Sequence, residues 1–298
     1  MAHGPSTMPA HGLPAAGRAP SLRRWDGLGY VLPAFLLLAF FFVLPVVALL
    51  LRSVLEPTPG LENFAKLLTT PTYAQVFLNT FTVAGVVTLA SLLAGFPVAW
   101  LLAVLPGRWA AFLFGVILLS MWTNLLARTY AWMVLLQRTG VINRALMDVG
   151  LIDAPLPLIR NLAGVTIGMT YIMLPFVILP LHATLRAIDP AVLQAASLCG
   201  ANRWQAFRRV LLPLSLPGVA AGSLMVFVMS LGYFVTPALL GGASTMMLAE
   251  LIAQLVQSLL DWGMGGAAAF VLLVVTLALY ALQVRFLGSG RMTAGGAG

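Results

Sequence analysis

Charged residues divide this sequence into long uncharged stretches. The chain has 298 residues, of which 16 are basic and 8 acidic, and six mainly apolar runs lie between the charges. A helix needs roughly 20 apolar residues to cross about 30 Å of hydrocarbon, because each residue adds about 1.5 Å. We therefore expect an all-α integral membrane protein with six transmembrane helices. The runs are 27–51, 67–107, 109–127, 161–185, 210–249 and 262–284.

The runs differ in length. The third, 109–127, is the shortest, whereas 67–107 and 210–249 are each too long for one span and too short for two spans with a loop. We expect one helix plus apolar loop in each long run, with the second span beginning at about Thr80 and the fifth ending near Pro237. The composition agrees with this interpretation, since 8% of the residues are charged, against about a quarter in soluble domains.

The placement of Lys and Arg predicts the orientation. If the N-terminus lies in the cytoplasm, the inner segments carry 10 of the 16 basic residues but only 2 of the 8 acidic ones. This excess follows the positive-inside rule, so we expect a multi-pass protein of the bacterial inner membrane with both termini in the cytoplasm. The net charge of +8 then needs no nucleic-acid partner. We expect a disordered cytoplasmic tail over 1–26, a six-helix membrane domain over 27–286 and a cytoplasmic C-terminal tail over 287–298.

Small residues cluster in two of the expected spans. Gly95 follows Ala90, Ser91 and Ala94 in the second span, and Gly222 stands among alanines and a serine in the fifth. Small side chains let helices approach closely where lipid gives no hydrophobic driving force. The pattern predicts a tightly packed bundle.

Several kinds of chemistry are missing from the sequence. Lys66 is the only lysine and lies outside any G-x-x-x-x-G-K-[ST] motif, so the chain cannot hydrolyse ATP as a P-loop enzyme does. His3, His11 and His182 lack acidic or cysteine neighbours at metal-ligand spacing, and Cys199 is the single cysteine. We therefore expect no catalytic residues, metal or cofactor. The uncharged runs also disfavour a proton- or sodium-coupled carrier, which typically holds ionisable groups at mid-depth.

The segment 189–213, between the fourth and fifth expected spans, has the local signals of two short helices. Asp189 suits an N-cap with Pro190 at the first helical position, and Gly200 suits the left-handed residue that ends a helix. Asn202 can cap a second short helix, which we expect Pro213 to end. The product is a helix–turn–helix elbow on the cytoplasmic side, with a small-residue face suited to another protein's groove.

This elbow resembles the EAA loop of ATP-binding-cassette (ABC) importer permeases. The family pattern is E-A-A, three residues, G, and further on L-P, and here Gln194 replaces the usual glutamate. In the family, this loop is the coupling helix that docks into the ATP-binding subunit. The alternative is an interfacial amphipathic loop. The resemblance assigns the coupling loop to Gln194, Ala195, Ala196, Gly200, Ala201, Phe207, Leu212 and Pro213.

Other segments are similar to the spermidine/putrescine-type permeases. They are 128–132, 140–143 and 232–242, and variants of them occur in permeases for ferric iron, opines and other small organic solutes. The resemblance implies the ABC type I importer (MetI-like) fold: five core helices related by inverted pseudo-symmetry and a first peripheral helix. It also implies cytoplasmic ATP-binding subunits, a second permease subunit forming a heterodimer, and a periplasmic or lipid-anchored solute-binding protein.

Within such a permease, a few polar residues are placed to line a translocation path, although each alone could form a packing hydrogen bond. The spans offer no carboxylate for a cation site, so a polyamine cargo would be selected chiefly by the binding protein. The alternatives are a permease for another small solute, such as ferric iron, an opine or an amino acid, and a secondary carrier or channel working alone. The path residues are Thr123, Asn124, Thr170, Tyr171, Ser230, Tyr233 and Thr236.

Overall fold

The computed structural model describes residues 28–56 and 58–292, so the tail predicted over 1–26 lies outside the described residues. The chain divides into two units, residues 1–48 and 49–298, and each is described by itself. All regular structure in the described residues is helical. The expected all-α fold is confirmed.

The first unit is part of one long apolar helix. It contains α1 (Leu28–Leu38), a π-helical turn η1 (Ala39–Val43) and the beginning of α2 (Leu44–Leu55). In the π-turn, the Leu44 N–H donates to the carbonyl five residues back, at Ala39. Pro45 follows directly. A proline lacks an N–H and its ring collides with the carbonyl four residues back, and a π-turn relieves that collision without ending the helix.

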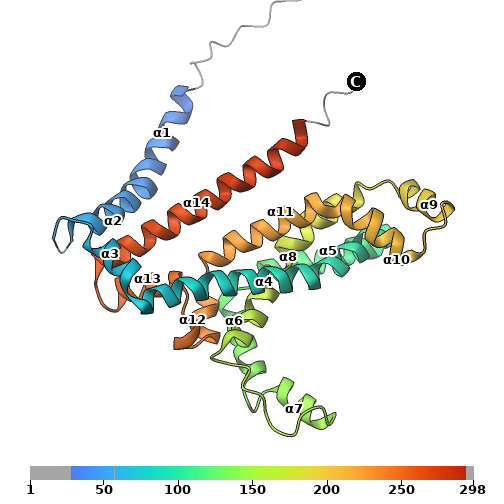
Figure 1. The fold of residues 1–298 in the computed structure, drawn as a ribbon, viewed down its shortest axis with the longest axis horizontal. Helices are drawn as coiled ribbons and strands as arrows, with labels where there is room; N and C mark the ends of the chain where they lie inside the picture. Colours follow the sequence, from blue (N-terminus) through green and yellow to red (C-terminus); the bar gives the residue numbers. More distant parts are fainter. Residues whose placement is uncertain (1–27, 57, 293–298) are drawn as a thin grey trace, which may run out of the picture. The chain divides into compact units, whose positions relative to one another are not determined.

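The second unit is a helical bundle with two projections, α7 and the pair α9–α10 (Figure 1). Its long helices belong to the bundle, and its short ones form the connections. After the end of α2, its elements are α3 (Glu62–Thr69), α4 (Pro71–Val104), α5 (Gly107–Trp122), α6 (Leu125–Leu136), α7 (Val141–Asp148), α8 (Leu162–Arg186), α9 (Pro190–Leu198), α10 (Arg203–Ala206), η2 (Phe207–Leu211), α11 (Leu212–Leu231), α12 (Val235–Leu240), η3 (Ala243–Thr245), α13 (Leu248–Gln257) and α14 (Trp262–Met292).

Among the described residues, five helices are long and apolar enough to cross a membrane, and there are six spans if one bent pair is counted as a single broken span. The bent pair is the expected third span, which breaks after Trp122 and turns by 97°. The six-span prediction is therefore confirmed, with the shortest run forming a broken span. The five unbroken helices cover Leu32–Leu55, Pro71–Val104, Leu162–Arg186, Arg203–Leu231 and Trp262–Leu282.

The core of the bundle is formed by α4, α8 and α11, which run side by side (Figure 1). Val177 of α8 lies between two glycines: a Cβ added at Gly95 of α4 would be 3.1 Å from its Cγ1, and one added at Gly222 of α11 would be 3.2 Å from its Cα. Larger residues at either position would force the helices apart. The close approach predicted from these glycines is confirmed.

Two predicted span boundaries are wrong. The second span begins at Pro71, well before Thr80, because a proline at the start of a helix loses no hydrogen bond. Thr80 is buried inside α4 and its hydroxyl accepts a hydrogen bond from Leu248 N (2.8 Å), which joins α4 to α13. The fifth span ends at Leu231, and Pro237 lies in the separate short helix α12.

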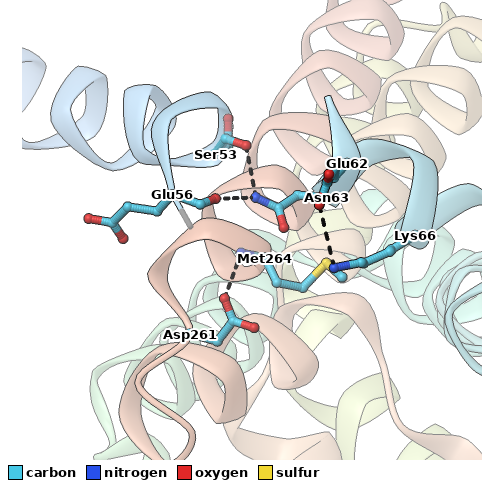
Figure 2. Close-up of polar contacts among 7 residues, drawn as sticks. All are labelled: Ser53, Glu56, Glu62, Asn63, Lys66, Asp261 and Met264. Atoms are coloured by element: carbon cyan, nitrogen blue, oxygen red, sulfur yellow. Dashed lines mark hydrogen bonds and ion pairs between the residues drawn. The ribbon is translucent and has the colours of Figure 1, made fainter. Parts of the chain in front are cut away.

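A buried amide joins the end of α2 to α3 and α14 (Figure 2). Asn63 Nδ2 donates to two carbonyls at the end of α2, Ser53 O (3.0 Å) and Glu56 O (2.6 Å). Those carbonyls have no partner inside their own helix, so the amide completes the helix end. Gly263 of α14 lies so close that an added Cβ would be 2.9 Å from Asn63 Nδ2. The junction therefore requires both residues.

Two further contacts surround this junction (Figure 2). Asp261 Oδ1 accepts a hydrogen bond from Met264 N (3.0 Å) at the start of α14, where a carboxylate also suits the helix dipole. Lys66 and Glu62 form an exposed ion pair at 4.0 Å, and such pairs contribute little. The buried amide, rather than the surface charges, holds α2 to α3.

Candidate functional site

The first arm of the elbow, α9, has the ends that the sequence predicts. Asp189 Oδ1 accepts a hydrogen bond from Ala191 N (2.8 Å), with Pro190 at the first helical position. Gly200 has φ +81°, in the left-handed region. Around it, Ala201 N donates to Ala196 O (3.0 Å) and Gly200 N donates to Ser197 O (3.0 Å), which is the Schellman pattern of helix termination. The predicted N-cap and turn are confirmed.

The second arm begins as predicted but does not end as predicted. Asn202 and Gln205 form a reciprocal capping box, with Gln205 N donating to Asn202 Oδ1 (2.8 Å) and Asn202 N donating to Gln205 Oε1 (3.0 Å). We expected Pro213 to end this arm, and that expectation is wrong. The helix continues from Arg203 to Leu231, because the π-turn η2 makes room for the proline, as η1 does before Pro45. The elbow is thus continuous with the fifth span.

Aromatic side chains fix one side of the elbow to the bundle. Phe207 packs edge-on against Phe96 of α4, with ring centroids 5.7 Å apart, and Trp204 stacks on Phe207 at 5.5 Å. Of the other predicted coupling residues, Ala196, Ala201 and Leu212 are half-buried. The rest are exposed: Gln194, Ala195, Gly200 and Pro213.

The elbow also exposes large apolar groups. Leu198 is 89% exposed and Trp204 is 65% exposed, and no residue of α9 is buried. The sequence interpretation missed Leu198 and Trp204. Their signal was available, because bulky apolar residues in a segment expected to lie in water indicate a contact surface.

The seven predicted path residues do not gather at one place. Ser230 and Thr236 are fully buried, and the Thr236 hydroxyl lies 3.2 Å from the Thr129 hydroxyl. Thr170 Oγ1 is buried without a hydrogen-bond partner. Asn124 caps α6, since its Oδ1 accepts from two backbone N–H groups of that helix. These four residues therefore belong to packing or helix ends.

The remaining three lie at or near the boundary between α5 and α8. Thr123 is exposed at the break after α5. Tyr171 lines a hollow between the two helices and its hydroxyl lies 3.1 Å from Ser120 Oγ. Tyr233 lines a second hollow beside α6 and α8. Sequence periodicity does not reveal this grouping.

Three hollows adjoin α8: one beside the ends of α4 and α5, one between α5 and α8, and one beside α6 and α11 that reaches α5 only at Met121. We call the boundary between α5 and α8, with these hollows, the α5–α8 seam. The end hollow near α6 has a volume of about 170 Å³, the middle hollow about 260 Å³, and the hollow near the elbow about 480 Å³. None of the residues of α5, all of which the structure describes, is buried. Helix α5 thus lies at the edge of the bundle, with Leu113, Phe114 and Ile117 half-buried against the core.

The seam carries basic groups at its two ends. Arg128 lines the hollow near α6, and its Nε is buried without a hydrogen-bond partner. His182 and Arg186 line the hollow near the elbow. Among the described residues, no acidic side chain lines any of the three hollows.

Comparison with known proteins identifies the class of membrane protein. A six-span helical bundle with a helix–turn–helix elbow before its fifth span is the architecture of an importer permease. The family model for the inner membrane component of binding-protein-dependent transport systems matches residues 28–287. The chain belongs to this family, and it is a multi-pass inner-membrane permease.

Relatives agree with the family assignment. The chain is 35% identical over 215 residues to the spermidine/putrescine transport system permease protein PotB of Escherichia coli K12, which covers 72% of this chain and 78% of that protein. It is 36% identical over 246 residues to the inner membrane ABC transporter permease protein YdcU of the same organism, covering 78% and 77%.

Solved structures agree on the fold. A chain of a bacterial alginate ABC transporter, in complex with an alginate pentasaccharide-bound periplasmic protein, aligns with a TM-score of 0.70 at 18% identity. The alignment covers 88% of this chain and 93% of that one. A chain of the MetNI methionine ABC transporter aligns with a TM-score of 0.55 at 18% identity, covering 74% and 96%. The expected ABC type I importer permease fold is confirmed.

Proposed function

We propose that this permease imports a polyamine, such as spermidine or putrescine, in a complex driven by ATP. We also propose that its elbow transmits conformational changes of the ATP-binding subunits to the membrane helices. The chain supplies the membrane path and binds no ATP itself. A second permease subunit forms the other half of a heterodimer, and a periplasmic or lipid-anchored binding protein delivers the solute. Both termini lie in the cytoplasm.

The exposed elbow carries this proposal. Leu198 and Trp204 present apolar surface that lipid does not cover if the elbow projects into water, and such a surface needs a protein partner. The capping box and the Schellman turn fix the angle between α9 and α10. Because η2 continues the second arm into the fifth span without a break, a displacement of α9 acts directly on a membrane helix.

The path is proposed to follow the α5–α8 seam. The hollows adjoin it, and Tyr171 and Tyr233 line two of them. A translocation path must bind its solute weakly enough to release it. The seam meets this requirement because it offers few polar groups. Thr123 lies near the seam, whereas Thr236 contacts the Thr129 hydroxyl in the core and the Ser230 hydroxyl is buried there without a hydrogen-bond partner.

A polyamine cargo is supported by the printed names of relatives such as PotB. The charges of this chain limit where selectivity for a cation can arise. Since Arg128, His182 and Arg186 line the hollows and no carboxylate of the described residues does, cation selectivity has to come from the binding protein or from the second permease. Permeases for ferric iron, opines or amino acids would use the same machinery.

The test is uptake of labelled spermidine and putrescine into proteoliposomes that hold the complete complex. We expect uptake that needs both ATP and the binding protein, and no exchange of solute by this chain alone. Exchange by the chain alone would contradict the ATP-driven import and favour a secondary carrier. ATP-dependent import of a different solute only would overturn the polyamine cargo.

A further inference from the structure

The hollow near the elbow has features that the translocation of a cation does not explain. It is the largest of the three, at about 480 Å³, and lies between the ends of α4, α5 and α8. Two of its lining residues, His182 and Arg186, stand one helical turn apart on α8 and therefore share a face. A cation path gains nothing from two basic side chains placed together.

The opposite wall adds further donors. Helix α5 begins at Gly107, which lines the hollow, and no side chain caps this helix start. Trp109 N and Ala110 N donate to Pro106 O, so the first N–H groups of α5 that are open to a ligand are those of Gly107 and Arg108, at the partially positive end of the helix. Nδ1 of His182 is buried and also has no hydrogen-bond partner. Donors from two helices thus surround a space lined by no acidic side chain.

We propose that this hollow binds a phosphate group, held by Arg186, His182 and the first N–H groups of α5. A guanidinium offers paired donors that match phosphate oxygens, and helix N-termini bind phosphate through backbone N–H groups. The other lining residues are small or apolar, including Leu102, Leu105 and Phe114. The phosphate comes from an anionic lipid headgroup or from free phosphate.

Two variants test the proposed phosphate site, one by removing its donors and one by filling the hollow. His182→Gln with Arg186→Gln removes the charged donors. Gly107→Leu fills the hollow, and it should not disturb packing, because a Cβ added at Gly107 meets no atom within 4 Å. Arg144→Gln on α7 is the matched control, since it removes a basic residue away from the hollow.

The full chain in detergent is titrated with phosphatidylglycerol and with phosphatidylcholine of the same acyl chains, and bound lipid is counted by native mass spectrometry. In a second arm, inorganic phosphate is added and the melting temperature is followed. We expect the wild type and Arg144→Gln to bind alike, and both hollow variants to bind roughly tenfold more weakly.

The arms separate the two sources of phosphate. A preference for phosphatidylglycerol that both hollow variants lose identifies a lipid headgroup. Stabilisation by inorganic phosphate, without a lipid preference, identifies free phosphate. If neither ligand distinguishes the wild type from the hollow variants, or if Arg144→Gln loses as much binding as they do, the proposal is wrong. The result does not depend on the cargo or on coupling.

Discussion

Helix α8 meets two very different kinds of neighbour. Toward α4 and α11 it packs at glycines, and a Cβ added at Gly95 or Gly222 would lie 3.1 or 3.2 Å from atoms of Val177. Toward α5 it leaves a row of hollows, and none of the residues of α5, all described, is buried. Tight packing transmits displacement, whereas a loosely packed boundary can open. We therefore expect α4, α8 and α11 to move as one body, and the proposed path to open beside α5.

A pair of glycine substitutions tests this contrast with the largest expected effect. Gly222→Leu should destabilise the protein by about 3 kcal/mol or more, because even a Cβ there lies 3.2 Å from backbone atoms of Val177. Gly115→Leu on α5 should be neutral or gain up to about 1 kcal/mol, since its Cβ meets nothing within 4 Å and leucine favours helix. Melting temperatures in detergent measure the stability of both variants. Equal losses of stability would mean that α5 is packed as tightly as the core of α4, α8 and α11.

Filling the seam should block transport and spare the fold. Ile117→Trp places a larger side chain in the middle hollow of about 260 Å³, so uptake should fall roughly tenfold or more while expression persists. Leu119→Trp is the control, because Leu119 is 71% exposed. The measurement is solute uptake by each variant, normalised to the amount of that variant in the membrane. Normal uptake by Ile117→Trp would place the path elsewhere.

Removing one hydroxyl group from the core and one from the seam should change the free energy of unfolding least among these tests. Thr236→Val loses a fully buried hydroxyl contact to Thr129 and should cost about 1 kcal/mol. Tyr171→Phe loses a contact with Ser120 at the seam and should cost less, because neither Tyr171 nor Ser120 is buried. Thermal unfolding of the two variants measures the difference. A larger loss for Tyr171→Phe would mean that the seam is as tightly packed as the core.

The sequence predicts the features that depend on neighbouring residues. Asp189, Gly200 and Asn202 have the predicted roles because caps and left-handed turns are decided by a few adjacent groups. Pro213 did not follow its local rule. Whether a proline ends a helix or is accommodated by a π-turn depends on whether packing favours continuing the helix.

The path residues were harder to predict because burial is decided between helices. Ser230 and Thr236 look like lining residues in the sequence, yet neighbouring helices bury them completely. Tyr171 and Tyr233 reach the hollows only because α8 and the α11–α12 connection are placed as they are. Hydropathy gives the number of spans, while the direction of each polar side chain requires the packed structure.

The coupling role of the elbow is tested most directly by its positive-φ glycine. Gly200 (φ +81°) and Gly150 (φ +73°) both have room for a Cβ, and only Gly200 lies in the elbow. Valine at either position strains the turn by about 1–2 kcal/mol, so the two substitutions are matched in local cost.

The measurement is ATP-dependent uptake by proteoliposomes holding the assembled complex. We expect Gly200→Val to assemble but to lose more than about nine-tenths of its uptake, because the displaced α9 no longer fits its partner. Gly150→Val should transport normally. If Gly200→Val transports as well as Gly150→Val while the complex remains assembled, the elbow does not couple ATP hydrolysis to transport.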